Sequence, residues 1–421
     1  MSMLLDRPQR AVWLGAAILI CASPLAIAQT DPAAPSYQSL LARLRQMPAV
    51  IEAAAQTEAA DARARQAHAI PNPSVGWEAE NIKGSGPYRG FAGAETTLSV
   101  TQSLELFGQR SARIGAARAD AVATSLRGEL LRWQAAGRLA QLYSEAEVAL
   151  RRMDLAIEAL RLAEQDEHAV SLLVDAGREA RLRGIQARSE AESARADLVQ
   201  ARAVRDAAFA RLSALAMLDM PIRSLEGSLL DSVPASHARD AGDARDSLAV
   251  RIAQAEVDLT GRRIAVERRR VRPEISAGIG LRHFSETRDD AFTLNLSFSV
   301  PLFDRNRDGV RAAHADQRAA EARLTALQRE VSAERLAAEA MLSASMVRVD
   351  AADQGIETAE EAYRMARIGF DAGRVPQLEL SSTRAALIAA RNAALDARLA
   401  RVRAEIALAG LDGRTPFGES R

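Results

Sequence analysis

The residues best able to bind a metal or catalyse a reaction are few and scattered along the chain, which has one cysteine and five histidines in 421 residues. The histidines are His68, His168, His237, His283 and His314. They never pair at the i, i+4 spacing that turns two imidazoles toward one metal on a helix. No nucleophile with a base, carboxylate pair or phosphate-binding loop occurs at a meaningful spacing. We therefore expect no enzyme, no metal site and no cofactor.

A cluster of arginines is the strongest charge feature of the sequence. It consists of Arg262, Arg263, Arg268, Arg269, Arg270 and Arg272. Such clusters can bind nucleic acid, but the chain as a whole is balanced, with 55 basic and 55 acidic side chains. Cations are also favoured where a helix ends beside a membrane strand. Together with the secretory signal described next, the balance argues against a nucleic-acid partner.

The N-terminus has the three parts of a secretory signal peptide. Arg7 and Arg10 precede an apolar run over residues 11–21, and Ala-Ile-Ala at 26–28 forms a cleavage site. We expect residues 1–28 to be removed. Cys21 follows Ile20 rather than a small residue, so we expect it to be lost with the signal and not acylated. The remaining chain has no apolar run of about 20 residues, so any membrane contact is expected from strands.

The elements that organise the chain occur twice. Residues 97–110 (TLSVTQSLELFGQR) and 293–306 (TLNLSFSVPLFDRN) both alternate apolar and polar side chains and then lead into a long alanine-rich helical pattern. The sequence DAGR recurs at 175 and 371, an offset of 196 that holds over the second part of each half. A constant offset indicates a duplication. Apolar residues at alternating steps of four and three, from Leu139, Tyr143 and Ala146 to Ile157 and Leu160, predict coiled-coil packing of the long helices. The same register recurs in the second repeat at Leu342, Met346, Val349 and Ile356, with Asp353 as its one polar residue.

The predicted organisation follows from this duplication. The first repeat, 29–218, has strands at about 74–82 and 96–107 and helices at about 38–70, 108–174 and 178–218. Residues 219–245 form a linker. The second repeat, 246–411, has strands at about 273–284 and 291–303 and helices at about 246–271, 305–370 and 377–411, before a tail at 412–421. The fold class is thus mostly α with membrane β.

Strands of about ten residues have the length that a tilted strand needs to cross a bilayer. Four strands cannot close a barrel, and open sheet edges are not tolerated in lipid, so the chain must oligomerise. Two copies would give eight strands with a filled interior, and three would give twelve around an open lumen. The alternation places Val100 and Leu296 on the lipid face and Ser297 in the lumen.

The duplicated plan and the glycine turn followed by a helix at 369–395 (GFDAGRVPQLELSSTRAALIAARNAAL) resemble the TolC family of trimeric outer-membrane efflux channels. The segment 71–110 is similar to the outer-membrane component of cobalt-zinc-cadmium efflux systems. The resemblance implies a homotrimer with a twelve-stranded β-barrel in outer-membrane lipid and a long α-helical barrel in the periplasm. It also implies two partners, a periplasmic adaptor and an inner-membrane proton-driven pump, with the chain as a passive conduit for divalent heavy-metal cations.

The resemblance also suggests an entrance. In the family, the helix after the second glycine turn carries two aspartates that form acidic rings around the closed aperture. Alignment on Gly373 places Glu379 at the first position and Ser382, which departs from the pattern, at the second. The internal offset of 196 makes Arg183 the counterpart of Glu379, and an ion pair between them would close the tip. Ordinary solvated helix charges are the alternative. The candidate adaptor contacts are the turn residues Gly177, Arg178, Gly373 and Arg374.

Two other functions compete with this hypothesis. A TolC-type channel for drugs or secreted proteins shares every structural argument, and only the segment 71–110 speaks against it. A soluble periplasmic coiled-coil adaptor would explain the helices, but it would not need four strands of alternating polarity beside glycine-rich loops.

Overall fold

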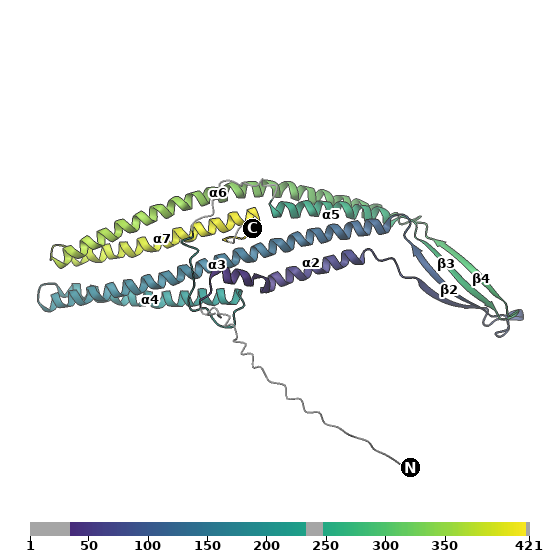
Figure 1. The fold of residues 1–421 in the computed structure, drawn as a ribbon, viewed down its shortest axis with the longest axis horizontal. Helices are drawn as coiled ribbons and strands as arrows, with labels where there is room; N and C mark the ends of the chain where they lie inside the picture. Colours follow the sequence, from purple (N-terminus) through teal and green to yellow (C-terminus); the bar gives the residue numbers. More distant parts are fainter. Residues whose placement is uncertain (1–33, 233–246, 418–421) are drawn as a thin grey trace, which may run out of the picture.

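Two long helical hairpins dominate the structure, in which 70% of the described residues are helical. The computed structural model describes residues 34–232 and 247–417. The hairpins are formed by α3 (Gln109–Asp175) with α4 (Arg181–Leu215), and by α6 (Arg307–Asp371) with α7 (Gln377–Asp412). They lie side by side with both turns at the same end of an elongated molecule (Figure 1). At about 1.5 Å per residue, α3 alone spans about 100 Å.

The seven-residue pattern packs these helices as predicted. Leu139, Tyr143 and Ala146 are each 0% exposed. In the second repeat Leu342 is buried, whereas Met346 of the same predicted seam is 44% exposed. Ile157 of the first seam is likewise 44% exposed, so the seam is partly open along both hairpins. No helix among the described residues is long and apolar enough to cross a membrane.

Shorter helices and a sheet complete the other end of the molecule. Helix α2 (Pro48–Gln66) packs on α3, and α5 (Leu248–Arg270) lies between α3 and α6 (Figure 1). The strands are β1 (Ser74–Glu80), β2 (Glu95–Leu104), β3 (Ile275–Phe284) and β4 (Asp290–Phe298). They form one antiparallel sheet in the order β1-β2-β3-β4, so the two repeats join where β2 pairs with β3.

The register gives the sheet one apolar and one polar face. Leu98 lies opposite Leu281, and Val100 lies opposite Ile279. All four side chains are exposed, between 44% and 68%. The other face carries small polar side chains and glycines. One row across all four strands consists of Gly76, Ser99, Gly280 and Thr293. Strands β1 and β4 each leave one edge unpaired within the chain.

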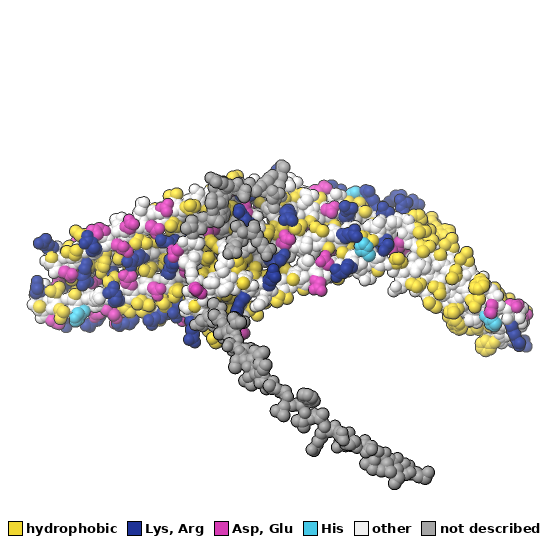
Figure 2. Space-filling model, in the orientation of Figure 1, with side chains coloured by type: hydrophobic (Ala, Val, Ile, Leu, Met, Phe, Trp, Pro, Cys, Tyr) yellow, Lys and Arg dark blue, Asp and Glu magenta, His cyan; other side chains and the backbone are white. Residues whose placement is uncertain are grey.

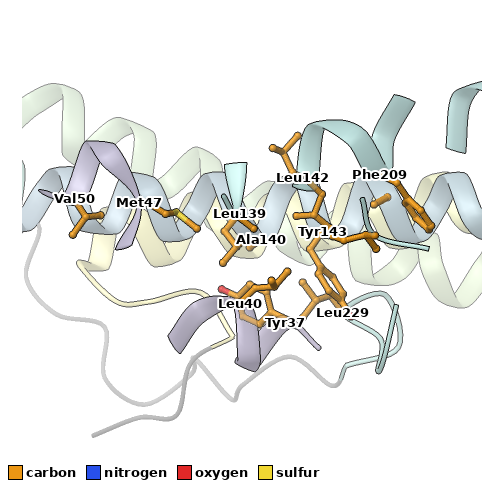
Figure 3. Packing of buried hydrophobic residues seen from close by; sticks show 14 residues of the cluster. Tyr37, Leu40, Met47, Val50, Leu139, Ala140, Leu142, Tyr143, Phe209 and Leu229 are labelled. Atoms are coloured by element: carbon orange, nitrogen blue, oxygen red, sulfur yellow. The ribbon is translucent and has the colours of Figure 1, made fainter. Parts of the chain in front are cut away.

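The largest apolar core lies near the middle of the molecule, where both ends of the described chain meet α3 (Figure 3). The hydroxyl of Tyr143 donates to the carbonyl of Glu226 at 2.6 Å, and that of Tyr37 donates to the carbonyl of Pro416 at 2.7 Å. Tyr37 belongs to α1 (Tyr37–Ala42). The first bond joins the linker to α3, and the second joins the start of the described chain to its end. The ring of Tyr37 also packs edge-on against that of Tyr143, with 5.8 Å between centroids, which holds the start of the described chain on α3.

The described part of the predicted linker is fixed by a buried carboxylate. Glu147 of α3 is 4% exposed and accepts hydrogen bonds from the backbone amides of Leu229 at 2.9 Å and Leu230 at 3.3 Å. From the other side, Arg401 of α7 donates to the carbonyl of Leu230 at 2.8 Å. The segment therefore bridges α3 and α7 as a strap.

Several predicted boundaries differ from the structure. The helix predicted at 38–70 is three pieces, because Pro48 begins a new helix after α1 and the short helix η1 (Arg43–Gln46). The strands predicted to reach 107 and 303 end at 104 and 298. Their last residues instead form tight turns, in which the amides of Leu106 and Leu302 donate to Leu104 and Val300. The predicted signal peptide, Cys21 and His237 lie outside the described residues. So do 233–245 of the predicted linker, residue 246 of the predicted second repeat and 418–421 of the tail.

Candidate functional site

The two DAGR turns lie together at the end of the helical hairpins. Gly177 and Gly373 adopt left-handed φ angles of 68° and 69°. Their amides donate to Val174 at 3.0 Å and Phe370 at 2.9 Å, so both turns close in the same way. Nothing lies within 4 Å of a Cβ added at either glycine, and the backbone conformation alone favours glycine. Arg178 and Arg374 follow directly and are exposed.

The three predicted entrance residues are close to these turns. Glu379 lies in the first turn of α7 and is exposed, and the hydroxyl of Ser382 donates to its carbonyl oxygen at 2.9 Å. Arg183 is half-buried at the start of α4, where it donates to Gln186 at 3.0 Å. Within one described chain no ion pair joins Arg183 to Glu379. Any such pair would have to form between subunits.

A buried ionic network joins all four long helices near this end. Asp166 of α3 is 2% exposed and accepts hydrogen bonds from Arg367 of α6 at 2.9 Å and from Arg384 of α7. Arg384 is itself 8% exposed and also donates to Glu190 of α4 at 2.6 Å. Apolar side chains from α3, α4, α6 and α7 pack near the same end, among them Val170 and Leu380. The network therefore fastens one hairpin to the other.

The ionisation of Asp166 depends on its two arginines. Burial raises the pKa of Asp166, whereas the charges of Arg384 and Arg367 and the hydrogen bond from Arg384 lower it. Loss of either arginine would thus raise the pKa further, because the desolvation would remain and the attraction would not.

Similar pairs continue along α7 at seven-residue intervals. The arginines are Arg384, Arg391 and Arg398. Arg391 donates to Glu158 of α3 at 2.5 Å and to Glu360 of α6 at 2.9 Å. Arg398 lies 2.7 Å from Asp353 of α6, which explains the one polar residue in the predicted seam of that helix. A seven-residue spacing keeps side chains on one face of a helix, so α7 presents a column of arginines toward its neighbours.

This column of arginines was not predicted, although its seven-residue spacing can be read in the sequence. Arg384, Arg391 and Arg398 are seven residues apart on α7, and Asp353 and Glu360 have the same spacing on α6. What could not be read was which acids of α3 would meet them. Among the described residues no group of three or more histidine, cysteine, aspartate or glutamate side chains could hold a metal ion.

The fold and this site point to a channel subunit, and comparison with known proteins decides its family. The chain matches the sequence profile of the outer membrane efflux protein family over residues 38–216 and 244–414. It belongs to this family. Family members are transport channels, and the chain is a protein of the cell outer membrane that extends into the periplasm.

Relatives of known role are similar along nearly the whole chain. The chain is 38% identical to the nickel-cobalt-cadmium resistance protein NccC of Alcaligenes xylosoxydans xylosoxydans, over 92% of this chain and 89% of that protein. It is also 38% identical to the nickel and cobalt resistance protein CnrC of Cupriavidus metallidurans, over 100% of this chain and 99% of that protein. The cobalt-zinc-cadmium resistance protein CzcC of the same organism is 26% identical, over 80% of each chain.

Solved structures show the same fold at lower identity. CusC superposes with a TM-score of 0.78 at 21% identity, covering 90% of this chain and 92% of that one. The open-state MtrE channel of Neisseria gonorrhoeae gives 0.78 at 20%, covering 90% and 89%. These likenesses confirm the predicted fold class of a TolC-like channel. The four-stranded sheet is consistent with a trimeric barrel, to which each chain contributes its two open edges.

Proposed function

We propose that three copies of this chain form a passive conduit that exports divalent heavy-metal cations across the outer membrane. The observation that carries this proposal is the 38% identity, along essentially the whole chain, to proteins named for nickel, cobalt and cadmium resistance. The fold supports a conduit: a sheet with one apolar and one polar face, continued by helices about 100 Å long. Such a conduit itself carries out no chemistry.

We propose that the cations arrive from an inner-membrane pump through a periplasmic adaptor that contacts the two hairpin turns. Gly177, Arg178, Gly373 and Arg374 are exposed at the end farthest from the sheet (Figure 1). This is the end that a partner crossing the periplasm would reach first. The left-handed glycines keep both turns narrow and free of side chains at their apex.

We propose that Glu379 forms the entrance ring. Three carboxylates at a narrow aperture would attract divalent cations. Arg183 supports closure between subunits, because it is half-buried and has no carboxylate partner within the described chain. Ser382 gives the second position of the ring a hydroxyl in place of a charge.

Metal tolerance of a host strain tests the exported substrate. Deletion of the gene should sensitise cells to nickel, cobalt, cadmium or zinc salts, and expression of the intact chain should restore growth. Dyes, detergents and antibiotics serve as the comparison set. Restored tolerance to these compounds without any change in metal tolerance would show a drug channel instead.

Single-channel recording tests the entrance. Glu379→Gln should weaken block of conductance by divalent cations, whereas Ser382→Asp, which adds a second acidic ring, should strengthen it. Arg183→Ala should raise the resting conductance. Recordings indistinguishable from the wild type for all three variants would leave these residues as solvated helix charges.

A further inference from the structure

Charged side chains lie on both sides of the layer formed by α3, α5 and α6, near the sheet. Arg263, Glu267 and Arg270 of α5 line one groove together with Arg113 of α3. Arg113 also donates to the carboxylate of Glu105, at 3.0 Å to Oε2. Glu105 directly follows the last residue of β2, inside the tight turn that Leu104 and Leu106 close. This groove therefore begins where β2 ends.

The opposite side of the same helices carries a second set of basic residues. At about 100° per residue, Arg268 lies roughly 150° from the centre of the groove-lining positions of α5. Arg272 is exposed two residues beyond the end of that helix. The same count places Arg118 of α3 and both Arg307 and His314 of α6 on that side. Figure 2 shows histidine and basic side chains on the same visible face of the molecule as the hydrophobic surface of the sheet. We call His68, Arg118, Arg268, Arg272, Arg307 and His314 the outward basic belt.

Two contacts within the belt are related by the internal duplication. Nη2 of Arg118 lies 3.1 Å from Nε2 of His68, and Nη2 of Arg268 lies 2.8 Å from Nε2 of His314. His68 corresponds to Arg268 at an offset of 200, and Arg118 corresponds to His314 at an offset of 196. The two repeats thus place the same pair at the same site with the two residue types exchanged. In the tautomer that accepts at Nε2, each imidazole keeps an Nδ1–H for a further acceptor.

The belt lies next to the apolar surface that faces lipid. Phe303 is 98% exposed and Phe298 64% exposed at the end of the sheet nearest the helices. Arg307 begins α6 immediately after this surface, and His314 follows about 10 Å farther along the axis. Figure 2 shows Lys and Arg side chains gathered where the helices meet the hydrophobic surface of the sheet. Long arginine side chains can span the remaining distance to the headgroup layer.

The helix dipole does not account for the belt. It favours cations at the C-terminus of α5, where Arg268 lies, but disfavours them at the N-terminus of α6, where Arg307 is the first residue. Among the described residues neither Arg272 nor Arg307 forms an ion pair with a carboxylate. Exposed guanidinium groups without a carboxylate partner are available to bind an anion from the membrane. A guanidinium binds phosphate through two parallel hydrogen bonds.

We propose that the outward basic belt binds the phosphate groups of anionic phospholipids in the periplasm-facing leaflet of the outer membrane. A trimer would present six histidine–arginine pairs around the channel. Each arginine near an anionic surface favours binding about fivefold, so removing two per subunit should weaken binding about 25-fold per subunit. Bound headgroups would set the height at which the channel sits in the membrane.

Retention of lipid by the purified trimer tests this proposal. The probe is phosphatidylglycerol, compared with phosphatidylcholine, added to the full-length trimer in detergent, and retained lipid is measured by native mass spectrometry. Wild-type protein should retain phosphatidylglycerol preferentially, and the double variant Arg118→Gln/Arg268→Gln should lose this preference. Arg263→Gln is the matched control, because Arg263 lies on the same helix but lines the inward groove, 3.7 Å from Asp120. It should keep the preference.

Three results would overturn the proposal. Equal retention of both lipids by the wild-type protein would contradict the proposal by itself. This measurement therefore tests the proposal even if the double variant fails to assemble. Loss of the preference in Arg263→Gln as large as in the double variant would show a general charge effect. Complete competition by inorganic phosphate at the same phosphate concentration would show a site for soluble phosphate and not for lipid.

Discussion

The network around Asp166 yields the sharpest energetic prediction. Arg384→Gln removes a guanidinium that is 8% exposed and leaves a carboxylate that is 2% exposed with Arg367 as its remaining arginine. Breaking a buried ion pair from one side costs about 3–5 kcal/mol, and because Arg367 stays in place we expect about 3 kcal/mol. At 1.4 kcal/mol per factor of ten, this corresponds to an opening of the two hairpins that is about 150-fold more frequent.

Hydrogen exchange measured by mass spectrometry reports this local opening directly. Amides of α3 and α7 next to Asp166 and Arg384 should exchange about 150-fold faster in Arg384→Gln, while those of the sheet should be unchanged. Arg364→Gln is the control, because Arg364 forms an exposed pair with Glu361 on the surface of α6, and it should have no measurable effect.

A double-mutant cycle identifies the cause. Asp166→Asn combined with Arg384→Gln should accelerate exchange less than the two single effects multiplied together, since each single change already breaks the same pair. Strict multiplication, or acceleration equal to that of the control, would refute the reasoning that this pair fastens the hairpins together.

Three further predictions concern the sheet, the turns and the linker. Leu296→Arg on the apolar face should cost about 2–4 kcal/mol and reduce the trimer on native gels, whereas Ser297→Arg on the polar face should assemble normally; equal losses would mean that the faces are misassigned. Bulky substitutions such as Gly177→Leu with Gly373→Leu should abolish metal tolerance in growth assays while outer-membrane fractions still contain the trimer. Glu147→Ala should leave two linker amides without an acceptor, cost roughly 2 kcal/mol and speed proteolysis of the linker, with unchanged cleavage as the contrary result.

Much of the fold could be predicted because its signals are local and repeated. The alternation around Val100 and Leu296 defined two-faced strands, and the spacing of Leu139 and Tyr143 defined packed helices. The ends of the strands were predicted less well. The alternation continues through the Leu-Phe pairs, but tight turns at Leu104 and Val300 end the strands, and these turns depend on hydrogen bonds that polarity does not encode.

The candidate site could be predicted only in part. The glycine turns and Glu379 followed from motif and resemblance, and the structure places them at one end of the molecule. The ion pair proposed between Arg183 and Glu379 does not form within the chain, and the buried Asp166 was not foreseen. The sequence around a single aspartate in a charged helix does not show that its side chain is buried. Its burial depends on which side chains of other helices pack around it.

The sequence by itself therefore determined the duplication, the hairpins and the two faces of each strand, because periodicity of side chains acts over a few residues. Only the tertiary structure decided which charges meet. Asp166 and Arg384 are 218 residues apart, and Arg268 contacts His314 on another helix. Such contacts depend on the rotation and axial stagger of long helices, which the packing of the whole layer sets. The exchange of histidine and arginine between the repeats became visible only once that stagger was known.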